Sequence, residues 1–178
     1  MSSVIKPTFT THDITMIAVF FALMQVVEII WIPGPIIGHL AYGILFGIVL
    51  ITAAIVIGKK YTILTLGILN TILNLFFAHM YGGTLAAFSY LTAAIALEGI
   101  LQISKPYAGN QKINIIGATL YGFVSRVTFV IILVFVYGWV LPSWIIIGTI
   151  VSFTIEFGIG GYLGHRFGNK IKNVVESL

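Results

Sequence analysis

The chain has 178 residues, of which 59% are hydrophobic and only 8% are charged, and its mean hydropathy is +1.10. A water-soluble domain of this size would expose far more polar side chains, so the composition predicts an integral membrane protein. The formal net charge of +4 arises from short groups of basic residues between apolar runs, and without a basic patch we expect no nucleic-acid partner.

The apolar runs predict an all-α bundle of membrane-spanning helices that forms a single domain over residues 1–178. Each run is close to the ~20 residues that cross a hydrocarbon core, and glycine, proline or charged residues separate the runs. The first run is too long for a signal-peptide core and lacks a cleavage site behind it, so we expect it to remain in the mature chain. The six predicted helices cover residues 14–31, 40–57, 61–78, 84–103, 113–137 and 143–167.

Basic residues fall on one side of this arrangement, whereas the three loops on the opposite side contain no Lys or Arg. Cytoplasmic loops of membrane proteins carry an excess of Lys and Arg, so the asymmetry predicts that both termini are cytoplasmic. Trp31, Trp139 and Trp144 gather on the outer side, as expected of an interfacial aromatic belt. The basic residues of the cytoplasmic side are Lys6, Lys59, Lys60, Lys105, Lys112, Arg166, Lys170 and Lys172.

Three ionisable residues lie deep within predicted spans. Counted at ~1.5 Å per residue, Glu98 lies nearer the cytoplasmic end of the fourth span, and Arg126 and Glu156 lie near the middle of the fifth and sixth. An ionised group in the bilayer interior is costly unless it is paired or faces water. We therefore expect an intramembrane ion pair of Arg126 with Glu156 or Glu98. In an alternative interpretation, the acid that is left over contacts a ligand or gates its cavity.

A second group of polar residues lies in the outer half of the predicted bundle. Asn70 and Asn74 are one helical turn apart, and Gln25 shares a helix face with Glu28. Apolar walls with a few convergent polar groups are typical of a small-molecule pocket, here one for a small polar aromatic compound. The asparagines also fit hydrogen bonding between helices, and His79 fits an ordinary loop. The candidate substrate-binding residues are Glu28, His39, Asn70, Asn74, His79, Tyr90, Trp139 and Trp144.

Small residues recur at a spacing of four in several predicted helices. Such residues share a helix face and let a second helix backbone approach closely. For Ala18 and Ala22 in the first span, the second helix belongs either to this chain or to another protein. We expect close helix packing, and no chemistry, at Gly43 and Gly47 and at Gly160, Gly164 and Gly168.

Motifs for catalysis are missing from the sequence. There is no HExxH, nucleophile elbow, Walker A loop or pair of carboxylates at a catalytic spacing. Cysteine is absent, which excludes thiolate chemistry and cysteine-ligated metals. His39 and His79 share the outer side, but no nearby residues in the sequence are placed to orient them as ligands, so nothing supports a metal or haem site. We expect neither enzymatic activity nor a cofactor.

These features together resemble the substrate-binding S component of an energy-coupling factor (ECF) vitamin transporter, and the likeness runs over most of the chain. In that family, an Ala-x-x-x-Ala motif in the first helix docks the membrane-embedded T component, and Ala18 and Ala22 occupy this motif here. The sequence is most similar to the YkoE-type branch, which is associated with thiamine and its hydroxymethylpyrimidine precursor. The matching segments are Gly34-Pro35-Ile36, Tyr42-Gly43 and Ala96-Leu97-Glu98.

The resemblance implies a plasma-membrane protein that captures a vitamin or precursor from outside, for uptake driven by a T component and two ATPase subunits. The sequence departs from the branch where acids are expected: His39 follows the Gly-Pro turn, and the third span offers only Asn70 or Asn74. These departures argue against a cationic thiazolium ligand and leave a neutral pyrimidine or another vitamin. The alternative functions are a self-sufficient small secondary transporter or channel, and a structural subunit of a membrane complex.

Overall fold

The computed structural model describes residues 9–29, 37–77 and 84–175, with the backbone alone at residues 37–40 and 77. This part of the chain is helical and contains no strand, which confirms the predicted all-α fold of six helices. A 3₁₀ turn, Thr84–Ala87, leads into the fourth helix, and a π-helical turn, Ile132–Val136, prolongs the fifth. The helices are α1 Thr11–Ile29, α2 Ile37–Ile57, α3 Thr62–Phe77, α4 Phe88–Leu101, α5 Gln111–Ile131 and α6 Ser143–Val175.

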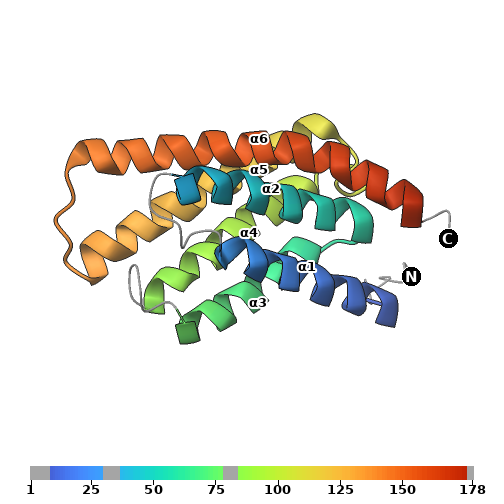
Figure 1. The fold of residues 1–178 in the computed structure, drawn as a ribbon, viewed down its shortest axis with the longest axis horizontal. Coiled ribbons are helices and arrows are strands. Elements are labelled where there is room, and N and C mark those ends of the chain that lie inside the picture. The colour runs from blue at the N-terminus through green and yellow to red at the C-terminus, as the bar shows by residue number, and fades with distance from the viewer. Residues whose placement is uncertain (1–8, 30–36, 78–83, 176–178) are drawn as a thin grey trace, which may run out of the picture.

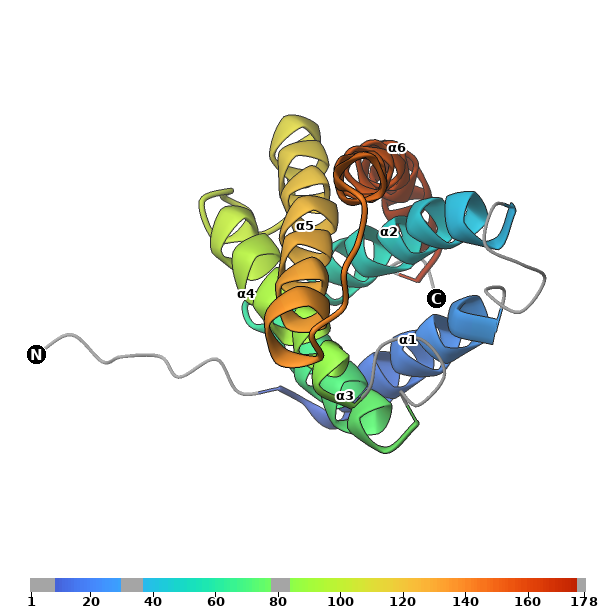
Figure 2. The ribbon, with the colours of Figure 1, turned by 90° about the vertical axis from the view of Figure 1, so that its left-hand side faces the viewer.

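The six helices form a closed ring in which sequence neighbours are not always spatial neighbours. Seen along the bundle, the order around the ring is α1, α2, α6, α5, α4 and α3 (Figure 2). Helix α6 therefore packs between α2 and α5, and α3 lies between α4 and α1. The helices alternate in direction, so α1 begins at the same end at which α6 ends (Figure 1).

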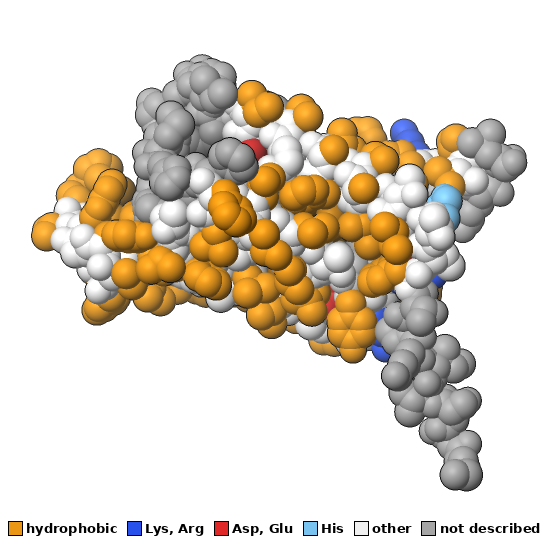
Figure 3. All heavy atoms as spheres, turned by 90° about the horizontal axis from the view of Figure 1, so that it is seen from below, with side chains coloured by type: hydrophobic (Ala, Val, Ile, Leu, Met, Phe, Trp, Pro, Cys, Tyr) orange, Lys and Arg blue, Asp and Glu red, His pale blue; other side chains and the backbone are white. Residues whose placement is uncertain are grey.

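The surface of the bundle is apolar around its middle, as the bilayer requires. Hydrophobic side chains cover the face in Figure 3, while basic and histidine side chains appear toward the end where α1 begins. Four helices are long and apolar enough to span a membrane, and two shorter apolar helices accompany them within the described residues. Large apolar side chains such as Phe76 and Phe135 are 70% and 81% exposed, which water would penalise and lipid does not. The chain is a multi-pass membrane protein.

Glycines bring α2 and α6 into close contact, as their spacing predicts. A Cβ on Gly160 would lie 2.5 Å from the carbonyl oxygen of Ile44, and one on Gly164 would lie 2.9 Å from that of Ile48. Gly47 lies against Gly160 on the facing helix. Without side chains at these positions, the two backbones approach more closely than any larger residue allows.

The basic end of the bundle begins with a capping box on α1. The backbone N–H of Thr10 donates to Oδ2 of Asp13 at 2.6 Å, and the N–H of Asp13 donates to the Thr10 hydroxyl at 3.3 Å. Lys59, in the turn between α2 and α3, forms an ion pair with the same Asp13 oxygen. This pair ties the start of α1 to the neighbouring helices.

Candidate functional site

A polar cluster lies between α1 and α3, toward the end of the bundle opposite the basic residues. Glu28, in the last turn of α1, accepts a hydrogen bond from Nδ2 of Asn70 at 2.9 Å and from Nδ2 of Asn74 at 3.2 Å. Nε2 of Gln25 donates to Oδ1 of Asn70 at 2.7 Å. Asn70 is fully buried, whereas Glu28 and Asn74 are half-buried. The amides thus hold the carboxylate in one orientation and leave part of it accessible.

Two tyrosines extend this cluster across the ring to α2 and α4. The hydroxyl of Tyr42 donates to that of Tyr90 at 3.4 Å, and the Tyr90 hydroxyl in turn hydrogen-bonds Glu28. Beneath them, Phe46 packs against Tyr42, with ring centroids 5.2 Å apart, and against Tyr121 at 6.2 Å. The polar groups therefore lie next to a layer of packed aromatic rings, which suits a flat aromatic ligand.

Arg126 of α5 lies beside the tyrosine pair and does not form the predicted ion pair. Its guanidinium carbon is 3.4 Å from the ring centroid of Phe153 and 5.1 Å from that of Phe129, so the cation is held by aromatic faces. Within the described residues, neither Glu98 nor Glu156 comes within ion-pair distance of it. Tyr42 and Glu156 act on it electrostatically over a longer range.

Glu98 has a different task from the one expected. It caps the start of α3, accepting from the backbone N–H of Tyr61 at 2.7 Å and of Ile63 at 3.1 Å, and the Tyr107 hydroxyl donates to it at 2.8 Å. Burial and the adjacent carboxylate raise the pKa of Tyr107, which keeps that hydroxyl a donor. The first N–H groups of a helix lack partners and carry partial positive charge, which a buried carboxylate satisfies. Glu98 therefore serves the fold at the basic end, away from the polar cluster.

Glu156 lies at the interface of α6 with α2. It is 3% exposed, and a Cβ added to Gly43 would fall 2.3 Å from its Oε2. The glycine therefore makes the room that this buried carboxylate occupies. Arg126, its predicted partner, turns its guanidinium toward Phe153, and Glu156 also acts electrostatically on that cation.

The structure brings together some of the predicted binding residues and separates others. Glu28, Asn70, Asn74 and Tyr90, four of the predicted binding residues, contact one another in the polar cluster. Trp139 and Trp144 lie in and after the α5–α6 connection and are 49% and 73% exposed, outside this cluster. The side chains of His39 and His79 lie outside the described residues.

Tyr42 and Arg126 were not predicted to lie at the site. A signal for Tyr42 exists, since a phenol in an apolar helix needs a hydrogen-bond partner when it is buried. Arg126 was assigned to an ion pair because spacing alone does not reveal the rings of Phe129 and Phe153 beside it.

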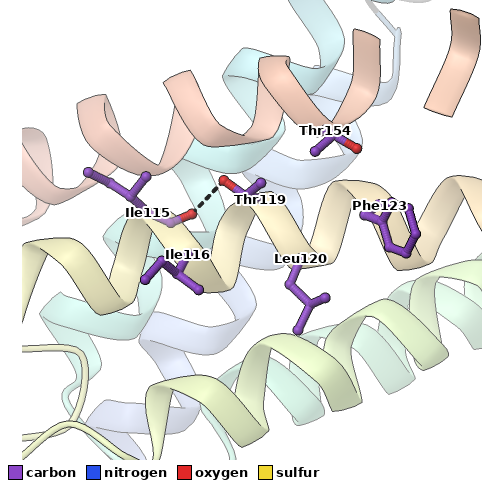
Figure 4. A pocket seen from close by; sticks show the side chains of 6 residues that line it. All are labelled: Ile115, Ile116, Thr119, Leu120, Phe123 and Thr154. Carbon is purple, nitrogen blue, oxygen red and sulfur yellow. Dashed lines mark hydrogen bonds between the residues drawn. The ribbon is translucent and has the colours of Figure 1, made fainter. Parts of the chain in front are cut away.

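Two further surface features lie away from the cluster. Ala18 and Ala22 are exposed on α1, so the other described helices leave this face uncovered. An apolar groove of about 320 Å³ runs along the outside of α5, with Thr154 of α6 at its edge (Figure 4). Thr119 turns its hydroxyl onto the carbonyl of Ile115 at 2.8 Å, so the groove offers only apolar contacts of the kind that lipid chains make.

No protein-family model and no curated protein matches this sequence. Among solved structures, the chain is similar to one described as the crystal structure of an S-component of ECF transporter, with a TM-score of 0.59. The two chains are 18% identical, and the match covers 94% of this chain and 86% of that chain. The likeness shows that the chain has the fold of that S component, over nearly its whole length.

Proposed function

We propose that this chain is the substrate-binding S component of an ECF-type ABC transporter in the plasma membrane. The observation that carries the proposal is the Glu28 cluster, in which side chains from α1, α2, α3 and α4 meet in a protein with the S-component fold. Buried polar groups are costly in a membrane protein, so their convergence at one point favours a binding site. The chain binds its substrate without transforming it.

The distribution of charge gives the direction of capture. The basic residues of the described helices, apart from Arg126, lie at the end where α1 begins, and Glu28 lies at the other end of α1. Because basic ends face the cytoplasm, both termini are cytoplasmic and the Glu28 cluster opens outward.

The chemistry of the cluster favours a thiamine-related pyrimidine as substrate. An aminopyrimidine carries an amino donor, for which the Glu28 carboxylate is an acceptor. Nδ2 of Asn74 already donates to Glu28 and to the Asn70 carbonyl, so the side-chain oxygen of Asn74 is a second acceptor. The rings of Tyr42 and Phe46 supply the apolar surface for its flat face.

The partners follow from the exposed face of α1. Ala18 and Ala22 form a shallow surface onto which a helix of a membrane-embedded T component packs closely. Two ATPase subunits bound to that component supply the free energy of uptake.

Reconstitution tests this function against its alternatives. The purified chain alone should bind the pyrimidine saturably but fail to move it into proteoliposomes, and uptake should require the T component, the ATPases and ATP. Transport by the chain alone would identify a self-sufficient transporter or channel. An absence of both binding and copurifying ATPases would identify a structural subunit.

A further inference from the structure

Arg126 carries a hydrogen-bond donor that no described residue accepts. A guanidinium has five N–H donors in a planar fork, and among the described residues the buried Nε of Arg126 has no hydrogen-bond acceptor. The ring of Phe153, 3.4 Å from the guanidinium carbon, supports the face of the cation and leaves its N–H edge unoccupied. A buried donor without an acceptor is costly, so an acceptor from outside the chain has a strong reason to bind there.

This edge belongs to the same interior as the Glu28 cluster. The guanidinium of Arg126 lies on the ring of Phe153, which is 6.0 Å from the ring of Tyr42. Tyr42 in turn donates to Tyr90, the hydrogen-bond partner of Glu28. Although they lie between helices, Glu28, Tyr90 and Arg126 are only half-buried, which leaves surface on each for a ligand to touch. A small molecule seated on the tyrosine pair therefore has a carboxylate on one side and a guanidinium on the other.

The charges of this region select the ligand. Among the described residues, the carboxylate of Glu28 and the guanidinium of Arg126 both lie near the tyrosine pair, so this part of the interior has no excess of positive charge that an anionic ligand would neutralise. A cationic group next to Arg126 would be repelled. An uncharged oxygen or ring nitrogen fits its N–H fork without either penalty.

We propose that Arg126 is a ligand-binding residue that donates to an uncharged acceptor of the substrate, while Glu28 and Asn74 bind its donor groups. The substrate is then a neutral, dipolar heteroaromatic compound. This inference rests on the proposed binding function and deepens it. For the hydroxymethylpyrimidine, the amino group lies toward Glu28 and the hydroxyl oxygen toward Arg126.

Chemical modification tests the accessibility of Arg126 without any variant. The reagent p-hydroxyphenylglyoxal is a small aromatic dicarbonyl that reacts with arginine, and Arg166, exposed near the cytoplasmic end of α6, is the only other arginine of the chain and serves as an internal control. Peptide mass spectrometry of the folded protein should find both arginines modified. Saturating 4-amino-5-hydroxymethyl-2-methylpyrimidine should protect Arg126 alone. Modification of Arg166 while Arg126 stays unmodified until the protein unfolds would overturn the assignment.

A binding cycle tests the role itself with two ligands that differ in one hydroxyl group. Arg126→Met should weaken the binding of the hydroxymethyl compound ~10-fold or more, as the loss of a hydrogen bond to a charged group requires. It should leave 4-amino-2,5-dimethylpyrimidine within about 3-fold of the wild type, since that compound lacks the acceptor. The affinity of Arg126→Lys for the hydroxymethyl compound should lie between those of the wild type and of Arg126→Met. Arg166→Met should change the affinity for neither compound.

The outcomes separate this inference from the proposed substrate. Equal affinity of the wild type and Arg126→Met for the hydroxymethyl compound would overturn the role of Arg126 and leave the pyrimidine as substrate. If neither pyrimidine binds or protects although Arg126 is modified in the folded protein, the pyrimidine is wrong, and Arg126 still lines an accessible site.

Discussion

At the scale of single residues, two carboxylates that look alike in the sequence have separate tasks because their surroundings differ. Glu28 is held by side-chain amides and stays half-buried, so it retains accessible surface for a ligand. Glu98 is 4% exposed, and its oxygens are occupied by the backbone of α3 and by Tyr107. The first arrangement suits binding, whereas the second stabilises a helix end.

The variant Glu98→Gln tests the capping role. It replaces charge-assisted hydrogen bonds to the N–H groups of Tyr61 and Ile63 with weaker neutral ones. We expect the free energy of unfolding to fall by about 1–3 kcal/mol, measured by thermal unfolding in detergent. Ligand affinity should not change in the folded fraction, and an unchanged melting temperature would contradict the role.

At the scale of helices, small residues that are enclosed by a neighbouring helix differ from small residues that stay exposed. Gly160 is enclosed by α2, whereas a Cβ on Gly148, in the same helix α6, would meet nothing within 4 Å. Ala18 and Ala22 are four residues apart, as Gly160 and Gly164 are, but they are exposed, as Gly148 is.

The pair Gly160→Ala and Gly148→Ala tests the contact between α2 and α6. Gly160→Ala places a methyl group 2.5 Å from the carbonyl oxygen of Ile44, so the helices must separate. We expect it to destabilise the protein by about 1–3 kcal/mol, measured as a lower melting temperature. Gly148→Ala should be neutral or slightly stabilising, because alanine is the better helix former. Equal melting of the two variants would rule out the packing role.

The double variant Ala18→Leu, Ala22→Leu tests the docking face of α1. Leucine side chains on an exposed small-residue surface should block a close helix contact, so copurification with a T component should be lost. Ligand affinity should stay within about 3-fold of the wild type, because Glu28 lies further along the helix. The control Gly99→Leu adds bulk at an exposed position of α4 and should leave assembly intact. Loss of ligand binding together with assembly would indicate damage to the fold instead.

For the whole molecule, the sequence predicts where the helices lie along the chain better than it predicts which helices pack against each other. A bilayer forces each span to satisfy its own backbone hydrogen bonds, so apolar runs mark the helices closely. Helix α6 continues past the predicted residue 167 to Val175, since the polar segment that follows remains compatible with a helix. The polar convergence of Glu28 with Asn70 and Asn74 was predictable from their common depth.

The surroundings of the site residues were predicted less well, because the sequence does not show in which order the helices are arranged around the bundle. Spacing within a helix does not state which helix faces it, so Arg126 was paired with acids although Phe153 lies against it. Glu98 was placed too deep because α4 ends at Leu101, which puts this residue in the last turn, level with the start of α3.

The orientation of the whole chain is open to a labelling test, because the protein has no cysteine of its own. Val140, in the α5–α6 connection, is 97% exposed, and Lys105, in the α4–α5 connection, is also exposed. In intact cells, a membrane-impermeant maleimide should label Val140→Cys and spare Lys105→Cys, which should react only after lysis. The opposite pattern would place the Glu28 cluster on the cytoplasmic side and contradict capture from outside.

The central claim is that the Glu28 cluster binds a small molecule, and equilibrium binding tests it most directly. The purified wild-type chain, without partner subunits, is screened by thermal shift against vitamins and their precursors, and each compound that stabilises it is titrated as a radiolabelled ligand. We predict saturable binding of a pyrimidine, weakened ~10-fold or more by Glu28→Gln and unaffected by the matched control Glu98→Gln. Binding that Glu28→Gln leaves intact, or no stabilisation by any compound of the screen, would contradict the claim.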